Sequence, residues 1–362
     1  MGGVSYNLDK QNININQDEV ITNESAYQAR LKLTNIVFDA LTVKYGIETI
    51  ISDYKQDYYS AAQENTFKTG FKDEYFAAFI EPEIKLSSRF AARIGWRFEY
   101  SGLNKKSSVQ PRISLATKLS TYSQFALAYG AFNQTVQNDF RKFNNDLKAE
   151  TAEHYILNFQ RVKKDRTFRI EVYYKNYDNL IKYSELNYPE KESYNNEGAG
   201  YAKGIDIFWR DRTTFKNIDY YVSYSFIDTK RDYHDYPSLV SPNYASAHNL
   251  SFVYKQWISK INSQIGLTYS YTSGRPYNDP NETEFMAGRT PQIRDLSANL
   301  SHLFQLFNRS AILHFSASNV LGFNKIYNYR FPIAPDENMN YQAYAIKPPA
   351  KRFFVLVFIL SL

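Results

Sequence analysis

Cysteine is absent from the 362-residue chain, and histidine occurs only five times. The absence of cysteine excludes disulfide scaffolds and cysteine-based zinc sites. The histidines show no metal-ligand spacing, and the chain has no serine–histidine–aspartate order, HExxH motif or phosphate-binding loop. We therefore expect no catalytic residues, no metal, no cofactor and no enzyme activity.

Long hydrophobic runs are missing as well. No stretch reaches the ~18 consecutive apolar residues of a transmembrane helix, and the opening MGGVSYNLDK has neither region of a signal peptide. Lysine and arginine total 43 against 37 acidic residues, with no basic cluster. Because nucleic-acid binding needs a concentrated basic stripe, we expect no nucleic-acid partner. The lack of long apolar runs does not exclude a membrane β-barrel, because the strands of such a barrel alternate lipid-facing and lumen-facing residues.

Aromatic side chains are abundant, with 32 tyrosines and 26 phenylalanines. A hydrophobic content of 43% excludes disorder as a description of the whole chain. Each buried tyrosine hydroxyl needs a hydrogen-bonding partner. So many tyrosines are therefore typical of positions where one end of the ring meets an apolar phase and the other meets water.

Hydropathy alternates with a period of two almost throughout the chain, as in residues 88–100. One face carries Ser88, Phe90, Ala92, Ile94, Trp96, Phe98 and Tyr100. The other face carries Arg89, Ala91, Arg93, Gly95, Arg97 and Glu99. Successive side chains of a strand point to opposite sides, so the pattern predicts a strand with one apolar and one charged face.

The same alternation predicts about sixteen strands and one all-β domain over residues 1–362, without a composition break. The predicted strands lie near 4–10, 26–37, 40–51, 72–86, 88–101, 110–119, 122–133, 151–162, 166–182, 201–211, 217–228, 248–258, 261–272, 293–304, 310–319 and 351–361.

The connections between these strands alternate between short and long. Short ones lie near 38–40, 87–88, 120–122, 163–165, 212–217, 259–260 and 305–309, and long ones near 52–71, 134–150, 183–200, 229–247, 273–292 and 320–350. Transmembrane barrels have short periplasmic turns and long outer loops, so we predict an antiparallel up-and-down transmembrane β-barrel. The alternative is a soluble β-rich binding module, a sandwich or propeller with its apolar face buried.

Several segments also carry a family resemblance. They include EYFAAFIEPEIKLSSRFAARIGWRFEYS at 74–101, QPRISLATKLSTYSQFALAYGAFNQT at 110–135, GYAKGIDIFWRD at 200–211, HFSASNVLGFNKIYNYRF at 314–331 and the final KRFFVLVFILSL. Together they resemble the barrel of TonB-dependent receptors, in particular those of Bacteroidota. The resemblance implies that the chain lies in the outer membrane of a Gram-negative bacterium and takes part in uptake of a scarce large nutrient. It does not distinguish whether this nutrient is a siderophore, a glycan, a peptide or a cobalamin. It implies outer-membrane lipid, a plug domain and the TonB complex as partners, with a surface lipoprotein as a further candidate.

The resemblance also implies a barrel of ~22 strands enclosing a plug, whereas the sequence shows sixteen strands and no plug or signal peptide. We therefore interpret the chain as the C-terminal part of a longer receptor. An alternative is that the sixteen strands close on themselves as a plugless outer-membrane pore, because unpaired strand edges are costly in lipid.

Charged residues on the polar strand faces are predicted to line the lumen and to contact a plug or water. They are Glu81, Glu83, Arg93, Arg97, Arg112, Arg169, Glu171, Lys175, Asp206 and Arg210. Charges on a shared face of neighbouring strands stabilise each other, so we expect Glu81 and Glu83 to pair with Arg93 and Arg97.

Ligand capture is predicted for aromatic residues of the outer loops, because a flat ring with a polar tip stacks on many ligands at low entropic cost. The candidates are Tyr183, Tyr188, Tyr194, Tyr233, His234, Tyr236, Tyr277, Tyr327, Tyr329, Tyr341 and Tyr344. The alternative for the tyrosines is that they pack the loops together. For His234, contact with a metal or siderophore stands against a solvated loop position.

Overall fold

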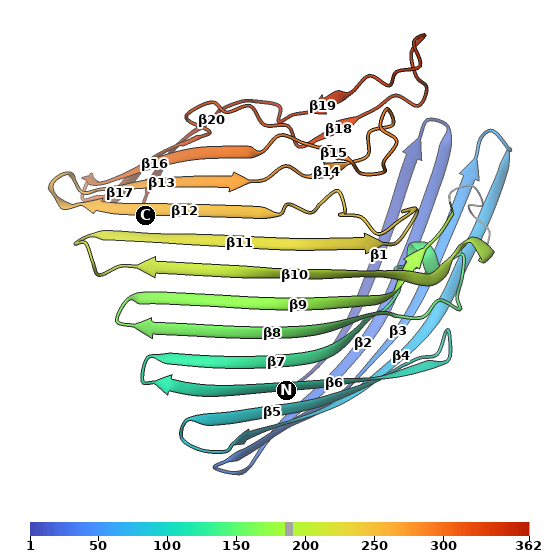
Figure 1. The fold of residues 1–362 in the computed structure, drawn as a ribbon, viewed down its shortest axis with the longest axis horizontal. Coiled ribbons are helices and arrows are strands. Elements are labelled where there is room, and N and C mark those ends of the chain that lie inside the picture. The colour runs from blue at the N-terminus through green and yellow to red at the C-terminus, as the bar shows by residue number, and fades with distance from the viewer. Residues whose placement is uncertain (185–190, 362) are drawn as a thin grey trace.

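A computed structural model describes residues 1–184 and 191–361. Sixteen strands form one antiparallel sheet in chain order (Figure 1). They are β1 (Gly2–Ile15), β2 (Asp18–Phe38), β3 (Leu41–Ser60), β4 (Asn65–Lys85), β5 (Phe90–Ser101), β6 (Lys106–Ser120), β7 (Ser123–Gln134), β8 (Glu150–Lys163), β9 (Arg166–Lys182), β10 (Asn195–Asp211), β11 (Ile218–Asp232), β12 (His248–Ile258), β13 (Ser263–Thr272), β16 (Ile293–Leu306), β17 (Arg309–Ser318) and β20 (Phe353–Leu360).

Small elements decorate the connections. They are the helix α1 (Asn138–Arg141), the 3-10 turns η2 (Lys191–Ser193) and η3 (Ser259–Ile261), and the strand pairs β14 (Pro276–Tyr277) with β15 (Gly288–Arg289) and β18 (Asn328–Arg330) with β19 (Tyr344–Ile346). No helix within the described ranges is long and apolar enough to cross a membrane.

Each of the sixteen predicted strands has its counterpart in the sheet, so the predicted all-β antiparallel order is confirmed. The long loop predicted at 52–71 is wrong. β3 continues to Ser60 and β4 begins at Asn65, and these two residues are register partners at the tip of a long hairpin. The sequence hides this hairpin because the extension has polar residues on both faces, which removes the contrast on which a strand prediction depends.

The described strands form a curved, open sheet. Figure 1 shows β1–β4 crossing behind the strands from β5 onward, as the walls of a trough. Within the described residues, the pairings of β1 are with β2 alone and those of β20 with β17 alone. Short turns lie at one end, while residues 135–149, 183–194, 233–247, 273–292 and 319–352 connect strands at the other, which confirms most of the predicted alternation.

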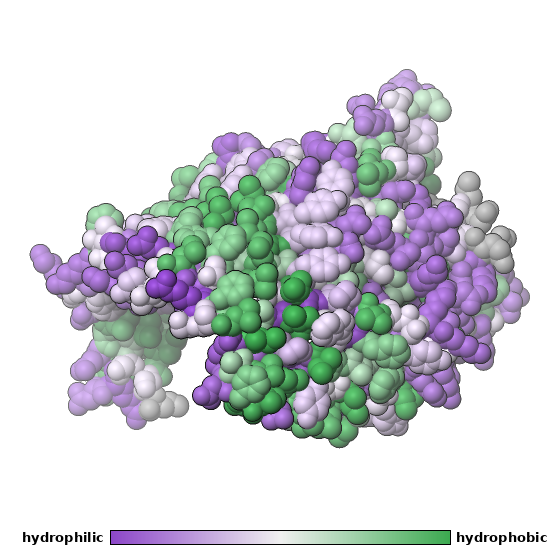
Figure 2. All heavy atoms as spheres, turned by 60° about the horizontal axis from the view of Figure 1, so that its bottom comes forward, coloured by the Kyte–Doolittle hydropathy of each residue, from purple (hydrophilic) through white to green (hydrophobic). Residues whose placement is uncertain are grey.

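The distribution of apolar side chains is inverted relative to a water-soluble protein. On β5, Trp96 is 48% exposed and Phe98 is 40% exposed, whereas the side chains of Arg97 and Glu99 are only 19% and 15% exposed. Figure 2 shows the resulting band of hydrophobic residues on the outward surface, flanked by polar residues. Ile113 and Ile205, which a sandwich would bury, are 40% and 37% exposed. The apolar faces therefore point outward, as lipid contact requires, and the soluble alternative is wrong.

Candidate functional site

The loop between β7 and β8, residues 135–149, folds inward over the lumen and builds a small core there. Its Val136 and Leu147 are buried against Ile181 of β9 and Tyr194, which precedes β10. Phe140 of α1 packs against this cluster. The β7–β8 loop is therefore packed against β9 and the segment before β10 rather than solvated.

Arg141 connects the β7–β8 loop to strand β4. Its guanidinium donates a hydrogen bond to the Asp73 carboxylate of β4 and lies 4.7 Å above the centre of the Phe71 ring. Asp73 also accepts hydrogen bonds from Ser101 Oγ at 2.9 Å and from the Leu103 backbone N–H at 3.1 Å. The side chains of Arg141 and Asp73 are only 10% and 4% exposed, so the ion pair is buried.

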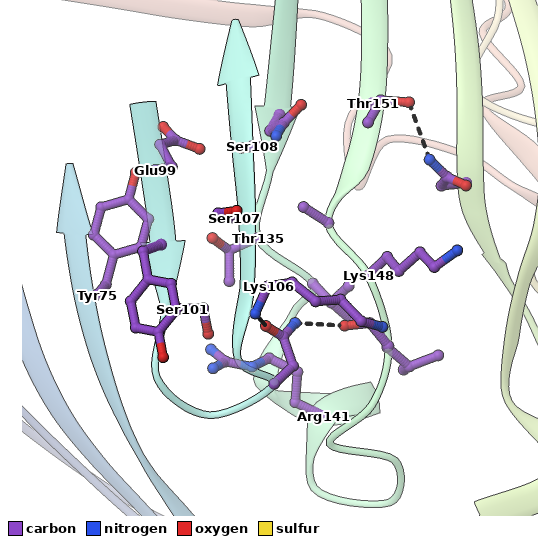
Figure 3. Close-up of a pocket in the computed structure, with 17 residues that line it drawn as sticks. Tyr75, Glu99, Ser101, Lys106, Ser107, Ser108, Thr135, Arg141, Lys148 and Thr151 are labelled. Atoms are coloured by element: carbon purple, nitrogen blue, oxygen red, sulfur yellow. Dashed lines mark hydrogen bonds between the residues drawn. The ribbon is translucent and has the colours of Figure 1, made fainter. Parts of the chain in front are cut away.

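A cavity of about 370 Å³ lies beside this pair. Figure 3 shows Arg141 at its base, with Tyr75 and Glu99 along one wall and Lys148 and Thr151 across from them. Its lining combines hydroxyl, amide and charged groups with apolar side chains such as Val136 and Leu147. Because the Arg141 charge is already neutralised by Asp73, this first cavity offers no unpaired charge from that residue to a ligand.

A second cavity, of about 590 Å³, lies on the other side of the loop and is bounded by β7–β9, β11 and the loop that follows β11. The two cavities share Asn133 and Thr151 as lining residues. We call it the Arg231 cavity. Its aromatic lining consists of Phe132, Phe140, His154, Tyr177, Tyr233, His234 and Tyr244.

Arg231 contributes a guanidinium group to the lining of this cavity. Its guanidinium carbon lies 3.4 Å from the centre of the Tyr177 ring. Its Nη1 is buried and has no hydrogen-bond partner among the described residues. A buried donor without a partner carries a desolvation cost of about 1–3 kcal/mol, more for a charged group.

His234 adopts a left-handed backbone conformation, with φ of 54°. Its backbone N–H donates to the Ile181 carbonyl at 2.6 Å, and its carbonyl accepts from the Tyr183 N–H at 3.0 Å. The imidazole stacks on Tyr233 at 4.1 Å and contacts Phe140 at 5.4 Å. Burial lowers the pKa of His234, partly opposed by the Asp235 carboxylate, and so favours the neutral ring. No group of three or more metal-ligating residues is found in the described parts of the chain.

The structure gathers five of the predicted aromatic residues in this region. Tyr183, Tyr194 and His234 surround Phe140, and Tyr236 contacts Tyr233 at 4.9 Å. Their ligand-binding role stays a prediction, because the same contacts also pack the loops together.

The remaining aromatic candidates lie elsewhere. Tyr277 and Tyr329 contact each other at 4.8 Å in a separate group. The backbone of Tyr341 is held by the Asn281 side chain, and the backbone N–H of Tyr327 donates to the Ile346 carbonyl. Tyr344 is 56% exposed, and Tyr188 lies outside the described residues.

Of the ion pairs predicted along the lumen, those of Arg93 are confirmed and those of Arg97 are not. Arg93 contacts Glu83 at 2.9 Å and Glu81 at 3.5 Å. Arg97 pairs instead with Glu99 at 2.6 Å and Glu48 at 3.1 Å, so its predicted pairing with Glu81 and Glu83 is wrong. Register explains the difference, because β4 pairs Glu83 with Arg93 but Phe79 with Arg97.

The other predicted lumen residues have mixed surroundings. Arg210 pairs with Asp219 at 2.6 Å, and Arg112 lies 4.6 Å above the Phe132 ring. Lys175 lies 5.1 Å above the Tyr173 ring, and Glu171 accepts from Asn158 at 3.1 Å. Asp206 is the register partner of Glu171, and Arg169 is that of Phe208 on β10. Their contact with a plug or water stays a prediction.

Sequence reasoning missed Arg231, Arg141 and Asp73. The sequence pattern could have located Arg231. If the alternation of the predicted strand 217–228 is extended by three residues, Arg231 falls on the same strand face as Thr229. Asp73 lies on the charged face of the predicted strand 72–86, but its pairing with Arg141 had no signal, because 68 residues separate them and only the inward fold of the loop brings them together.

Outward apolar side chains, an inward charged face and a site beneath the long loops define the class of outer-membrane β-barrel receptors. The chain belongs to the family described as TonB dependent receptor-like, beta-barrel, which matches residues 2–319. Barrels of this family are receptors and transporters of the Gram-negative outer membrane, which is therefore the location of this chain. The narrower resemblance to Bacteroidota receptors stays a prediction. No curated protein sequence matches the chain.

Solved structures share the fold at low sequence identity. The ferric citrate transporter FecA in the unliganded form has 13% identity and a TM-score of 0.69, covering 99% of this chain and 58% of its own. The outer membrane transporter YddB from Escherichia coli has 12% identity and a TM-score of 0.71, covering 95% and 55%. The ferric yersiniabactin uptake receptor FyuA from Yersinia pestis has 12% identity and a TM-score of 0.71, covering 100% and 58%. The chain thus spans little more than half the length of these proteins.

Proposed function

We propose that residues 1–362 form a single barrel domain that serves as the barrel portion of a TonB-dependent importer of a scarce large nutrient. Family membership and the inverted surface support this proposal. A plug domain would contact the charged inner faces of β3–β6, and the TonB complex would supply energy through that plug. Outer-membrane lipid would cover the outward face, and a surface lipoprotein is a further candidate partner. The proposed activity is binding and transport without catalysis.

The Arg231 cavity is the proposed capture site, and the Arg231 guanidinium among the aromatic lining residues is the observation that carries this assignment. The charged groups of the lining are the Arg231 guanidinium and the Glu150 carboxylate, whose Oε1 accepts from the Ile181 backbone N–H at 3.1 Å. Charge-assisted hydrogen bonds to anionic oxygens are roughly twice as strong as neutral ones. Within the siderophore, glycan, peptide and cobalamin classes, an anionic metal chelate fits this lining best. FecA and FyuA, whose names state ferric citrate and ferric yersiniabactin, share the fold.

Binding of two kinds of probe to the purified chain tests the proposal. Ferric citrate and a ferric tris-catecholate are the anionic probes, and maltoheptaose and cyanocobalamin serve as the other arm. We expect an anionic chelate to bind most tightly, and Arg231→Gln to weaken that binding about 10–100-fold, the value of a hydrogen bond to a charged group.

Arg330→Gln is the matched control, since Arg330 is exposed on an outer loop and does not line the cavity. Its affinity should equal that of the unmodified chain. Tighter binding of maltoheptaose or cyanocobalamin, or equal affinity in Arg231→Gln, would overturn the assignment of the cavity to anionic chelates.

A further inference from the structure

A groove of about 580 Å³ lies on the outward surface across β6–β10, on the opposite side of the sheet from the Arg231 cavity. Apolar side chains form its lower part, toward the short turns. These are Leu115, Leu127, Leu157 and Val172, which are successive register partners, whereas Ile113 lies at the level of Tyr129. Leu157 and Val172 are 37% and 41% exposed, so the groove is open to the surrounding membrane.

A row of three tyrosines crosses the upper part of the groove. Tyr129, Tyr155 and Tyr174 are successive register partners, with ring centres 5.0 and 6.3 Å apart. The hydroxyls of Tyr129 and Tyr155 donate to the Glu153 carboxylate at 3.1 and 3.2 Å. The tyrosine row therefore has apolar side chains on one side and hydrogen-bonding groups on the other. This is the environment of an aromatic ring at the boundary between acyl chains and headgroups.

A cation completes the groove at this level. Lys203 is the register partner of Tyr174, and its side chain is 55% exposed. Its ammonium lies 3.3 Å from the Asp228 carboxylate and 5.5 Å from the centre of the Tyr201 ring. An ammonium has three donors, so Lys203 can hold a second anionic group while it contacts Asp228.

We propose that this groove binds one molecule of a phosphorylated glycolipid of the outer leaflet. One acyl chain lies along Leu127, Leu157 and Val172, where the groove is apolar. The sugar rings stack on the exposed faces of the tyrosine row, whose neighbouring carboxylates Glu153 and Asp228 accept from sugar hydroxyls. A phosphate oxygen accepts from Lys203.

The choice of a glycolipid over an ordinary phospholipid follows from the upper half of the groove. Acyl chains are common to both lipids, so the lower half does not distinguish them. A glycerol phosphate headgroup would use Lys203 and could donate its free hydroxyls to a carboxylate, but it has no ring to cover the tyrosine faces. Carboxylates repel a bare anionic headgroup, whereas sugar hydroxyls donate to them. The inference uses the outer-membrane location and is independent of the proposed transport.

The test is lipid retention by the full chain, purified in mild detergent and observed by native mass spectrometry. Lipid A is the phosphorylated glycolipid probe, and phosphatidylglycerol is the anionic phospholipid probe. We expect one lipid A per chain, bound at least about tenfold more tightly than phosphatidylglycerol. Leu157→Trp, which fills the groove, and Lys203→Gln, which removes the cation, should each weaken lipid A binding about tenfold, the scale of one lost charge-assisted contact.

Matched variants separate this site from general membrane contact. Leu300→Trp changes an outward leucine that is 41% exposed and lies on β16, outside the groove. Lys230→Gln removes an exposed lysine of β11 that does not line it. Both should retain lipid A as the unmodified chain does, and circular dichroism should show the same strand content for all four variants. Equal retention of phosphatidylglycerol and lipid A, or unchanged retention in Leu157→Trp, would overturn the proposal.

Discussion

Arg141 and Asp73, 68 residues apart in the sequence, form a buried ion pair that joins the inward-folded β7–β8 loop to strand β4. Thr69 strengthens the junction by donating from Oγ1 to the Lys142 carbonyl at 2.9 Å. Both contacts join the β7–β8 loop to the same strand, β4. The shape of both cavities therefore depends on this one junction.

Asp73→Ala should release the loop, because it leaves the Arg141 charge buried without its partner. Breaking a buried pair in this way costs about 3–5 kcal/mol. We expect faster hydrogen exchange in residues 135–149, with strands β5–β7 unchanged. The double variant Asp73→Ala/Arg141→Met should recover much of the protection, since it removes the uncompensated charge. Asp146→Ala is the control, because Asp146 pairs with Lys191 at the surface. Equal exchange in the Asp73 variant and this control would contradict the role of the pair.

Docking of the outer loops should weaken as the pH falls through about 6.5, the ordinary pKa of histidine. Burial holds the pKa of His234 below that value. The undocked loop therefore takes up a proton more readily than the docked loop, and the docked state loses stability at low pH. Limited proteolysis of residues 233–247 between pH 5 and 8 measures this. His234→Phe keeps the stacking on Tyr233 and should flatten the profile; an unchanged profile in that variant would contradict the assignment.

Tryptophan fluorescence should report which faces meet lipid. Trp96 and Trp209 are 48% and 36% exposed on the outward surface, whereas Trp257 shares a strand face with the buried Val253. In single-tryptophan variants placed in bilayers with brominated acyl chains, Trp96 and Trp209 should be quenched strongly and Trp257 weakly. Equal quenching of all three would contradict the outward orientation of the apolar face.

The turn after β10 should depend on the Asp211 carboxylate. It accepts from the backbone N–H groups of Thr213 and Thr214 at 2.8 and 2.9 Å and contacts Arg166 at 3.0 Å. Burial opposes ionisation, but the hydrogen bonds from Thr214 and Thr213 outweigh it and hold the pKa of Asp211 well below its usual range.

Because this pKa is lowered, the stabilisation is present at pH 7 and is lost as the pH falls below about 3.9. Asp211→Ala should therefore lower the temperature at which the folded band disappears in gel-shift assays at pH 7. Asp165→Ala, a change at the exposed neighbouring turn, should leave that temperature unchanged. Equal shifts in the two variants would count against a special role for Asp211.

The amino-acid sequence by itself determined the number, order and facing of the strands. Side chains such as Phe98 and Arg97 alternate because a strand places neighbours on opposite sides, and the lipid–water contrast makes that alternation visible. Where the contrast fades, as in the outer parts of β3 and β4, the sequence no longer marks the strand ends. Register, which is set by pairing between strands, decided that Arg97 meets Glu48 of β3 rather than Glu81 of β4, while Glu99 lies two residues along its own strand.

Only the tertiary structure decided the site. Arg231 and Tyr177 lie on different strands, and the inward fold of the β7–β8 loop closes the cavity in which they meet. That fold depends on contacts between residues far apart in the chain, such as Asp73 with Arg141. Local alternation carries no information about such contacts, because it records the faces of a strand and not the path of the loops that connect the strands.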